Sequence, residues 1–353
     1  MSENKLPRVT IVASSLNSAR YLPEMIESVL VQDYPNLELF IQDGGSQDGT
    51  LELLQHYPIR WASEPDKGIS QALNRAIQAA HGEIIGFTSS DDKLQAGAVA
   101  IAVETFQAYP KTVLVYGDCY LSNESGRPYK LWKSRPFDLD QLFWGDYIPF
   151  QTTYVRRQAL LDVGGFDETM RAGQDIDLWV RLGGLYPAES FQYVSKVLGN
   201  YRYRFNSFGG KNFHETALSN EKTSESFFNN PLTVTKLKKG KNRALAGANL
   251  TSAFFLALSN NKKSAWKYII RALRLYPALV FTKGGLSTIL YTIAGPQLWR
   301  SYKMLQQRRK IENRELIVAT DQSGRYFDIE LPVVDCHLSD PVIKQGINGK
   351  GDR

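Results

Sequence analysis

The sequence predicts an α/β fold, in which a Rossmann-like, mainly parallel sheet with flanking helices precedes a basic helical region. Short apolar segments alternate with amphipathic segments through the first 110 residues, and polar clusters directly follow the apolar ones. Sixteen Lys or Arg and no Asp or Glu occupy residues 236–310, whereas the rest of the chain holds 26 basic and 36 acidic residues. This asymmetry indicates two parts with different roles.

The expected elements follow one another in regular order. The strands are short, mainly apolar segments at residues 9–14, 37–41, 59–63, 83–87 and 113–116. The helices have apolar residues at helical spacing and cover residues 20–31, 49–56, 68–80 and 175–182. The aromatic and acidic segment 137–147 favours a loop or lid. The segment 209–230 is rich in Asn, Ser, Gly and Phe, which predicts a linker.

Polar residues lie where four of the expected strands end. They are Ser14-Ser15, Asp43, Glu64 to Lys67, and Asp91-Asp92. In open parallel sheets, ligands bind beyond the carboxyl ends of the strands. We therefore expect these four segments to converge on one crevice.

The segment Asp43 to Thr50 carries the glycines of a tight turn between a strand and a helix. Its turn permits close approach by a ligand, and Asp43 can accept a hydrogen bond from a base or a ribose. An ordinary turn in which Ser46 or Asp48 caps the next helix fits equally well. The segment matches neither the Gly-x-Gly-x-x-Gly pattern nor a phosphate-binding loop that ends in Gly-Lys-Ser/Thr.

Asp91 and Asp92 form a pair of adjacent carboxylates directly after an apolar strand. Their repulsion destabilises the fold unless a cation offsets it. Mg²⁺ and Mn²⁺ prefer oxygen ligands and are often held by one or two carboxylates together with substrate phosphates. The alternative is a solvated Asp-Asp turn or helix cap.

Asp175 lies at the start of an expected helix that Ile176, Trp179 and Val180 can anchor in the core. A carboxylate is favoured at a helix N-terminus, and one placed there can accept a proton from an acceptor hydroxyl. The simpler interpretation is that Asp175 or Asp177 only caps the helix.

Together these segments resemble the family 2 glycosyltransferases, which have the GT-A fold. The resemblance covers residues 7–210, and its matching positions are Val9 to Asn17, Asp43 to Thr50, Ser63 to Ile69, Asn74, Gly82-Glu83, Ser90 to Asp92, Gly164 to Glu168, and Asp175 to Leu182. Gly44, Ser89 and Gln174 stand where many members carry an acidic residue (or, at the position of Ser89, Asn). The Gln-x-x-Arg-Trp motif of processive synthases is absent from the sequence, which favours addition of one sugar per encounter.

The resemblance implies an inverting, metal-dependent hexosyl- or N-acetylhexosaminyl-transferase. Its donor would be a nucleotide-sugar, expected to be a UDP-sugar. Its acceptor would be a hydroxyl of a glycan or lipid-linked molecule in cell-surface polysaccharide or glycolipid synthesis of the bacterial type.

The same resemblance assigns roles to single residues. The donor-binding residues would be Ser14, Asp43, Asp66, Lys67 and Asp91. Asp91 and Asp92 would hold Mn²⁺ or Mg²⁺, and Asp175 would be the catalytic base. The segment Tyr201-Arg202-Tyr203-Arg204 lies where members often carry basic or His residues, so it fits a phosphate contact or a solvated strand about equally.

Two other function classes remain open. A sugar-phosphate nucleotidyltransferase would need a Gly-rich loop with a basic residue near the N-terminus, which residues 14–20 do not supply. A non-catalytic membrane-binding scaffold with the GT-A fold would not need Asp91, Asp92 and Asp175.

The domain prediction places the catalytic domain at residues 1–225, a basic, amphipathic, membrane-associating helical region at 226–315 and a partly disordered tail at 316–353. In the expected helix 262–276, Trp266, Ile269, Ile270 and Leu273 form one stripe, and Lys263, Lys267, Arg271 and Arg274 form another. The apolar segment 278–298 is interrupted by Lys283, two adjacent glycines, Gly295 and Pro296. It therefore favours a segment lying on the membrane or re-entering it over a span.

Such a basic region favours an anionic membrane surface as partner. The alternative is a helical pair packed on the catalytic domain with a solvated basic face. No nucleic-acid-binding motif accompanies the charge, so nucleic acid is not an expected partner. The polar segment Met1 to Leu6 is unlike a signal peptide, and two cysteines are too few for a disulfide framework. We therefore expect a cytoplasmic protein, peripheral on the inner face of the cell membrane.

Overall fold

A computed structural model describes residues 6–203 and 213–293, apart from residues 231, 232, 234, 238, 260, 283 and 284. The predicted tail after residue 316 and the end of the apolar segment, residues 294–298, lie outside the described residues. The strands are β1 (Val9–Ser15), β2 (Leu37–Asp43), β3 (Arg60–Ser63), β4 (Ile84–Ser89), β5 (Lys93–Leu94), β6 (Leu114–Ser122), β7 (Pro128–Trp132), β8 (Tyr154–Arg156) and β9 (Phe191–Arg202).

The helices of the sheet-containing part are short. They are α1 (Leu22–Leu30), α2 (Thr50–Leu54), α3 (Ile69–Ala79), α4 (Ala98–Ala108), α5 (Leu139–Leu142), α6 (Arg157–Asp162) and α7 (Gln174–Leu185). The chain continues through α9 (Phe213–Asn229), α11 (Lys241–Leu258), α12 (Lys262–Leu275) and the 3₁₀ helix η3 (Pro277–Phe281). Residues 285–293 are also helical.

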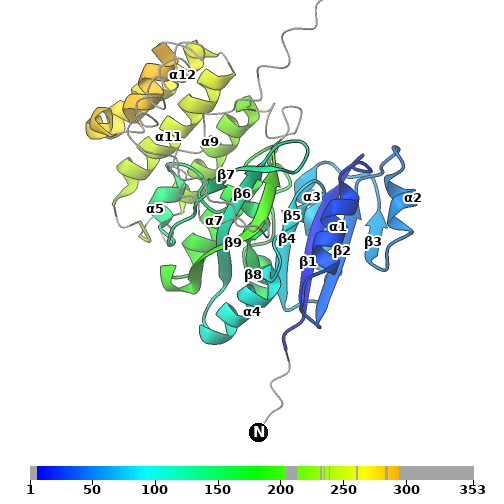
Figure 1. Cartoon of the computed structure of the whole chain (residues 1–353). Coiled ribbons are helices and arrows are strands. Elements are labelled where there is room, and N and C mark those ends of the chain that lie inside the picture. The colour runs from blue at the N-terminus through cyan, green and yellow to red at the C-terminus, as the bar shows by residue number, and fades with distance from the viewer. Residues whose placement is uncertain are drawn as a thin grey trace, which may run out of the picture.

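The strands form one mixed sheet in the order β3-β2-β1-β4-β8-β6-β9-β5, with β7 paired to β6 (Figure 1). The first four strands in this order are parallel, whereas β8 is antiparallel to both β4 and β6. The predicted α/β architecture and its parallel half are confirmed. The antiparallel part was not predicted, because only one of its strands has a continuous apolar run.

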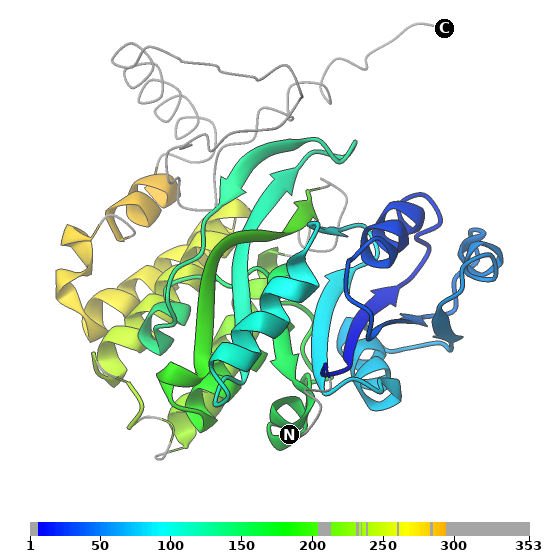
Figure 2. The same cartoon turned by 60° about the horizontal axis from the view of Figure 1, so that its bottom comes forward.

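Helices cover both faces of the sheet. Residues of β1 alternate between two cores: Ile11 packs with α1 and α4, while Val12 packs with α3 and α7. In Figure 2 the cyan helix α4 crosses in front of the strands. Because the inner strands are buried on both faces, they are mainly apolar, and the sequence predicts them for this reason.

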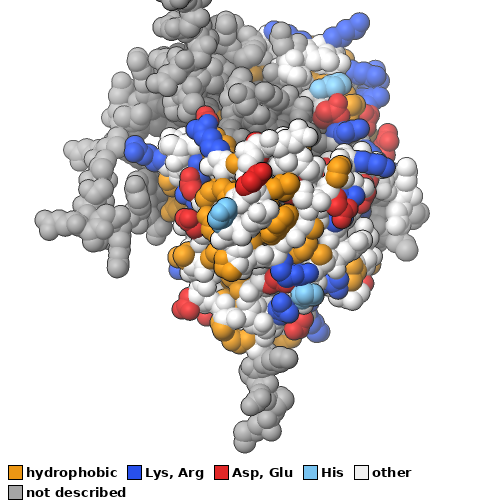
Figure 3. Space-filling view, turned by 90° about the vertical axis from the view of Figure 1, so that its right-hand side faces the viewer, with side chains coloured by type: hydrophobic (Ala, Val, Ile, Leu, Met, Phe, Trp, Pro, Cys, Tyr) orange, Lys and Arg blue, Asp and Glu red, His pale blue; other side chains and the backbone are white. Residues whose placement is uncertain are grey.

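Strand β3 forms one edge of the sheet, and its side chains are half-buried or exposed. Figure 3 views the molecule from this side, where Lys and Arg are interspersed with Asp and Glu around groups of hydrophobic side chains. This face therefore does not carry a single sign of charge, unlike the segment 236–310 of the sequence.

Helix α9 corrects the predicted linker at residues 209–230. It is 17 residues long, and Ala217, Phe227 and Phe228 are buried against neighbouring helices. Tertiary packing outweighs the weak helix propensity of its Asn and Ser residues. The proposed domain boundary after residue 225 falls within this helix.

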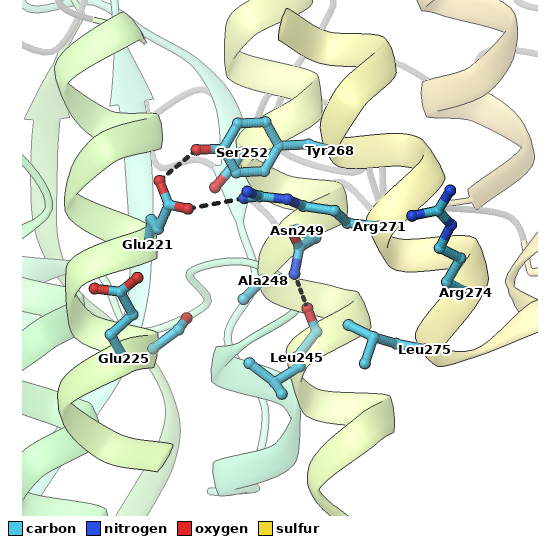
Figure 4. Close-up of a pocket in the computed structure, with 11 residues that line it drawn as sticks. Glu221, Glu225, Leu245, Ala248, Asn249, Ser252, Tyr268, Arg271, Arg274 and Leu275 are labelled. Carbon is cyan, nitrogen blue, oxygen red and sulfur yellow. Dashed lines mark hydrogen bonds and ion pairs between the residues drawn. The ribbon is translucent and has the colours of Figure 1, made fainter. Parts of the chain in front are cut away.

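Glu221 of α9 also links it to α12 (Figure 4). Its carboxylate accepts hydrogen bonds from Tyr268 Oη at 2.5 Å and from Arg271 Nη1 at 2.9 Å. These residues line a cavity of about 360 Å³ between α9, α11 and α12. The helices α9, α11 and α12 are thus held together by buried contacts and a partly buried ion pair.

Within the described residues, no helix combines the length and apolar character needed to cross a bilayer. The predicted stripe on α12 is only partly exposed, because Ile269 is fully buried while Trp266 and Ile270 are accessible. The helix instead packs inward through Ala265, Tyr268, Ile269 and Ala272.

Candidate functional site

The carboxyl ends of the parallel strands β1, β2, β3 and β4 lie next to one another at the same end of the sheet. Ser14 is in register with Gln42 on one side and Ser89 on the other, and Asp43 is in register with Ser63. The predicted convergence of these strand ends is therefore present in the fold. Ser14 itself is half-buried at this edge.

Hydrogen bonds connect the loops that follow these strands. Asn17, at φ 50°, donates its backbone N–H to Ser46 Oγ at 2.7 Å, and its Oδ1 accepts from the backbone N–H of Gln47 at 2.9 Å. Ser18 Oγ lies 2.8 Å from Ser90 Oγ, which links the β1 loop to the β4 loop. The three loops are held as one unit before any ligand binds.

Asp43 organises the turn after β2. Its Oδ2 accepts hydrogen bonds from the backbone N–H groups of Gly45 and Ser46, both at 2.8 Å, and from Ser63 Oγ at 2.7 Å. Its Oδ1 accepts from Ser46 Oγ at 2.5 Å. The carboxylate is fully buried, so its first role is to fix this turn. A contact with a nucleotide would use the remaining acceptor capacity of Oδ1.

Asp66 lies directly over this turn. A Cβ atom added at Gly44 would lie 2.4 Å from Asp66 Oδ2, so the glycine leaves the space that this carboxylate occupies. Asp66 Oδ1 accepts from the backbone N–H of Gly68 at 2.8 Å. Asp66 is half-buried and Lys67 is exposed, so both remain accessible to a ligand at this edge.

Asp92 is the buried member of the carboxylate pair after β4. It is 1% exposed, and its Oδ1 accepts from the backbone N–H of Arg202 at 2.7 Å. Burial, with the neighbouring charge of Asp91, raises the pKa of the Asp92 carboxyl well above its ordinary value. Its Oδ2 is buried and has no hydrogen-bond partner among the described groups.

This pair fits a divalent cation of the Mg²⁺ or Mn²⁺ kind. An unsatisfied buried carboxylate oxygen is unusual in proteins and needs an explanation, which a cation would provide. Asp91 is half-buried beside it. In the described residues there is no cluster of three or more His, Cys, Asp or Glu side chains suited to a metal. Two carboxylates with substrate phosphates are nevertheless a usual ligand set for these ions.

Arg202 joins β9 to the β4 loop and is buried. Its Nε donates to the carbonyl of Asp91 at 2.8 Å, and its Nη2 donates to Glu24 Oε2 at 2.8 Å. Arg202 is therefore not on a solvated strand, and its guanidinium donates to protein groups. It positions the backbone of the carboxylate pair. Arg204, the other arginine of the predicted segment, lies outside the described residues.

Asp175 lies in the first turn of α7, after Gly173 at φ 64°. Burial raises the pKa of its carboxyl, although backbone N–H groups of the helix start oppose this effect. The charge of Asp175 adds to burial in raising the pKa of Asp146, which precedes a short segment leading to β8. The ionisation of Asp146 therefore depends on the charge of Asp175, although the two residues come from distant segments.

Tyr201 of β9 connects the two acidic groups. Its burial is the main cause of its raised pKa, and the charges of Asp92, Asp91 and Asp175 raise that pKa further. The carboxylate pair after β4 and the carboxylate of α7 therefore act on one phenol.

Asp146, Tyr201 and the role of Arg202 are the parts of the site that the sequence did not reveal. Asp146 is an isolated acidic residue in an aromatic segment, with no motif around it. Its Oδ1 accepts from the backbone N–H of Ile148 at 2.9 Å, which is the pattern of an ordinary turn. Only the packing of Phe143 and Tyr147 into the core brings it near Asp175.

Comparisons with known proteins agree with this architecture. The sequence model of the family described as Glycosyl transferase family 2 matches residues 10–163. The chain is 28% identical over 201 residues to a chondroitin synthase of Escherichia coli, covering 56% of this chain and 29% of that protein. It is 29% identical over 211 residues to a PGL/p-HBAD biosynthesis glycosyltransferase of Mycobacterium bovis, covering 58% and 78%.

Solved structures share the fold at lower identity. Residues 1–349 of S. aureus TarS in complex with UDP-GlcNAc superpose with a TM-score of 0.59 at 15% identity, covering 91% of this chain and 99% of that one. The mannosyltransferase PcManGT of Pyrobaculum calidifontis, in complex with GDP-Man and Mn²⁺, has a TM-score of 0.57 at 20% identity, covering 86% and 85%. With the sheet described above, these findings show that the chain has the GT-A fold and that its residues 10–163 match the family 2 glycosyltransferases.

Proposed function

We propose that this protein transfers one sugar from a nucleotide-sugar to an acceptor hydroxyl, with inversion at the anomeric carbon. The observation that carries the proposal is the convergence of the polar ends of β1, β2, β3 and β4, where Asp92 has a buried carboxylate oxygen without a hydrogen-bond partner among the described groups. The charges of Asp92, Asp91 and Asp175 all raise the pKa of Tyr201, which supports a position of Asp175 within electrostatic range of this site. That arrangement supports a donor site and a base on the two sides of one reaction centre.

In the proposed reaction, the acceptor oxygen forms a bond to the anomeric carbon while the bond from that carbon to the diphosphate oxygen breaks. The electron pair of the broken bond leaves with the nucleoside diphosphate, and the acceptor proton passes to Asp175. A carboxyl whose pKa is raised by burial is a stronger base than a solvated one once ionised. A divalent cation held by Asp91 and Asp92 would supply Lewis-acid stabilisation of the leaving diphosphate.

The proposed donor is a UDP-sugar that carries a hexose or an N-acetylhexosamine. TarS in complex with UDP-GlcNAc supports uridine, whereas PcManGT in complex with GDP-Man keeps guanosine as a second possibility. The names of the chondroitin synthase and of the PGL/p-HBAD glycosyltransferase support a glycan or lipid-linked acceptor in surface polysaccharide or glycolipid synthesis. The residues proposed to contact the donor are Ser14, Asp43, Asp66, Lys67 and Asp91.

A donor panel tests this proposal. The full-length protein is incubated with UDP- and GDP-sugars, Mn²⁺ or Mg²⁺ and simple hydroxyl acceptors, and both nucleoside diphosphate and glycosylated product are measured. Release of diphosphate with matching product is the expected result. Conversion of a nucleotide-sugar to nucleoside triphosphate with added pyrophosphate would favour a nucleotidyltransferase. Donor binding without turnover of any donor would favour a scaffold.

We also propose that the protein is cytoplasmic and peripheral on the inner face of the cell membrane. The boundaries proposed are a catalytic domain at 1–225, a membrane-associating region at 226–315 and a tail at 316–353. Support comes from the sixteen basic and no acidic residues at 236–310. Each basic residue near an anionic leaflet adds on the order of 1 kcal/mol of attraction.

Asp66→Ala is expected to raise the KM for the nucleotide-sugar by about 10- to 100-fold, the size of a lost hydrogen bond to a charged group. Gly44→Ala is expected to act in the same direction, because the new methyl group would occupy the place of Asp66 Oδ2. Steady-state kinetics of both variants and of the double variant measure the effect. If Gly44→Ala acts by displacing Asp66, the double variant should be no worse than Asp66→Ala. Fully additive losses would contradict this role for Asp66.

Asp146→Asn is expected to remove one of two ionisations from the pH profile of kcat/KM. Two coupled carboxyl groups release their protons in two steps, and burial places both steps above the ordinary range for Asp. Asn keeps an acceptor for the N–H of Ile148 but cannot ionise. Asp162→Asn, at a fully exposed carboxylate of α6, should leave the profile unchanged. An unaltered profile in Asp146→Asn would show that the pair is not part of the reaction centre.

A further inference from the structure

The helix at residues 285–293 exposes three of its large aliphatic side chains, whereas Tyr291 and the partly buried Ile289 pack against the core. Its buried positions are Gly285, Thr288, Tyr291 and Thr292. Its exposed positions are Leu286, Leu290 and Ile293, with exposed fractions of 51%, 39% and 58%. A surface helix normally turns its apolar stripe to the core and its polar side to water. Here three large aliphatic side chains are exposed and two threonines are buried, so contact of the outer face with water is unfavourable.

Packing fixes the helix in this orientation. The ring of Tyr291 is buried 5.7 Å from the ring of Phe254 of α11. At the helix start, a Cβ atom added at Gly285 would lie 2.0 Å from the carbonyl oxygen of Leu279, so the backbones touch there. Rotating the helix to bury its leucines would break both contacts. These two contacts therefore hold the helix with Leu286, Leu290 and Ile293 facing outward.

Phe281 extends the apolar surface at the end of η3. Its side chain is 91% exposed, the highest exposed fraction among the large hydrophobic residues described. We call the four residues Phe281, Leu286, Leu290 and Ile293 the outer apolar surface. Four large apolar side chains within thirteen residues are more than the scattered exposed leucines of an ordinary surface.

Cations lie on the helix that shares a core with this segment. Tyr291 packs in the same cluster as Tyr268 and Ile269 of α12. The opposite side of α12 exposes Lys263, Lys267 and Arg274, with Trp266 and Ile270 between them. Interleaved cations and large apolar side chains are typical of helices that lie in a membrane interface.

We propose that the outer apolar surface inserts into the interfacial layer of a lipid bilayer whose anionic headgroups attract the basic residues of the region 236–310. This inference rests on the membrane association in the proposed function and identifies the side chains that enter the lipid. A bilayer fits better than a contact with the same region of a second copy, because residues 236–310 contain no acidic residue to pair with these cations. The segment would lie on the membrane, since Lys283, two adjacent glycines, Gly295 and Pro296 interrupt its apolar run.

The proposal separates two components of binding. Attraction of the basic residues to anionic lipid is screened by salt, whereas apolar insertion is not. Burying one large apolar side chain corresponds to a change of about tenfold or more in a binding constant. Removing two such side chains should therefore abolish most of the binding that remains at high salt.

Vesicle flotation of the full-length protein tests this surface. Phe281→Ser/Leu290→Ser, its two single variants and Lys263→Ala/Lys267→Ala are compared on phosphatidylcholine vesicles with and without phosphatidylglycerol, at low and high salt. A matched control is Leu161→Ser/Leu185→Ser, at exposed leucines of the catalytic domain. The apolar double variant should lose the salt-resistant binding by tenfold or more, and each single variant should lose part of it. The lysine variant should lose mainly the salt-sensitive binding, and the control should bind as the unmodified protein does.

Three outcomes would overturn the proposal. Unchanged high-salt binding in the apolar variants would exclude insertion at this surface. Equal loss in the leucine control would make the effect nonspecific. Loss of self-association in sedimentation equilibrium, with unchanged vesicle binding, would assign the surface to a second copy of the chain. Transfer to a soluble acceptor, measured on the same variants, is expected to stay unchanged, so failure of the membrane proposal and failure of the transferase proposal give different results.

Discussion

Asp175→Asn is expected to lower kcat by about 10²- to 10⁴-fold while the KM for the donor changes little. This range is what a positioned general base contributes, and the amide of Asn cannot accept the acceptor proton. Donor binding should survive, because the proposed donor contacts lie on other segments. The measurement is transfer by the full-length variant at saturating donor and acceptor, over a range of pH.

Stability separates this role from helix capping. Burial raises the pKa of Asp175, so the folded protein disfavours its charged form at neutral pH, and Asn should keep or raise the melting temperature. A carboxylate that only caps α7 would instead lower stability by about 0.3–1 kcal/mol when neutralised.

Asp177→Asn is the matched control for Asp175→Asn. Asp177 pairs with Arg181 Nε at 2.7 Å and accepts from Thr223 Oγ1 at 3.1 Å. This substitution should reduce stability and leave kcat nearly intact. A stable Asp175→Asn variant with normal kcat would remove Asp175 from the reaction.

The parallel half of the sheet and its polar strand ends could be predicted because they depend on local patterns. Buried parallel strands are mainly apolar, and the rule for ligand sites in open sheets then places Asp43 and Asp91 at the same end of the sheet. Ser89 and Gly44 depart from the usual family pattern, yet the loops around them are still tied together through Ser18 and Ser46.

The remaining features depend on contacts between distant segments. Helix α9 has the composition of a linker, and its buried Phe227 and Phe228 stabilise it only when α5 and α11 are in place. Asp146 meets Asp175 through the packing of a loop. Arg202 is basic in a segment where basic residues suggest phosphate, but its partners come from α1 and the β4 loop. The two members of each of these contacts lie too far apart in the sequence for a local pattern to predict them.

Asp92→Ala is expected to lower kcat/KM by about 10²-fold or more, since a cation at a departing phosphate contributes several kcal/mol to catalysis. The same variant should lose the increase in melting temperature that Mn²⁺ with a nucleoside diphosphate gives the unmodified protein, because a ligand that binds only the folded state stabilises it. Activity and melting temperature are measured with and without Mn²⁺, so that a folding defect is distinguished from a loss of binding.

Asp92→Asn is expected to lower activity and, in the absence of a cation, to raise stability. The pKa of Asp92 is raised in the folded state, so above about pH 4 the folded protein keeps a proton that the unfolded chain has lost. The free energy of unfolding therefore falls as the pH rises from about 4 toward the folded-state pKa of Asp92. Without added cation, Asp92→Asn should therefore melt at a higher temperature than the unmodified protein at neutral pH, and the difference should shrink near pH 4.

Asp48 offers the reverse case on a neighbouring loop. Burial tends to raise its pKa, but hydrogen bonds from Thr50 and Ala19 outweigh burial and lower it, so its charge stabilises the fold above about pH 4. Asp48→Asn should accordingly melt at a lower temperature at neutral pH. If Asp92→Asn behaved like Asp48→Asn in the absence of metal, Asp92 would be a structural carboxylate. The unsatisfied Oδ2 would then have to be explained by something other than a cation.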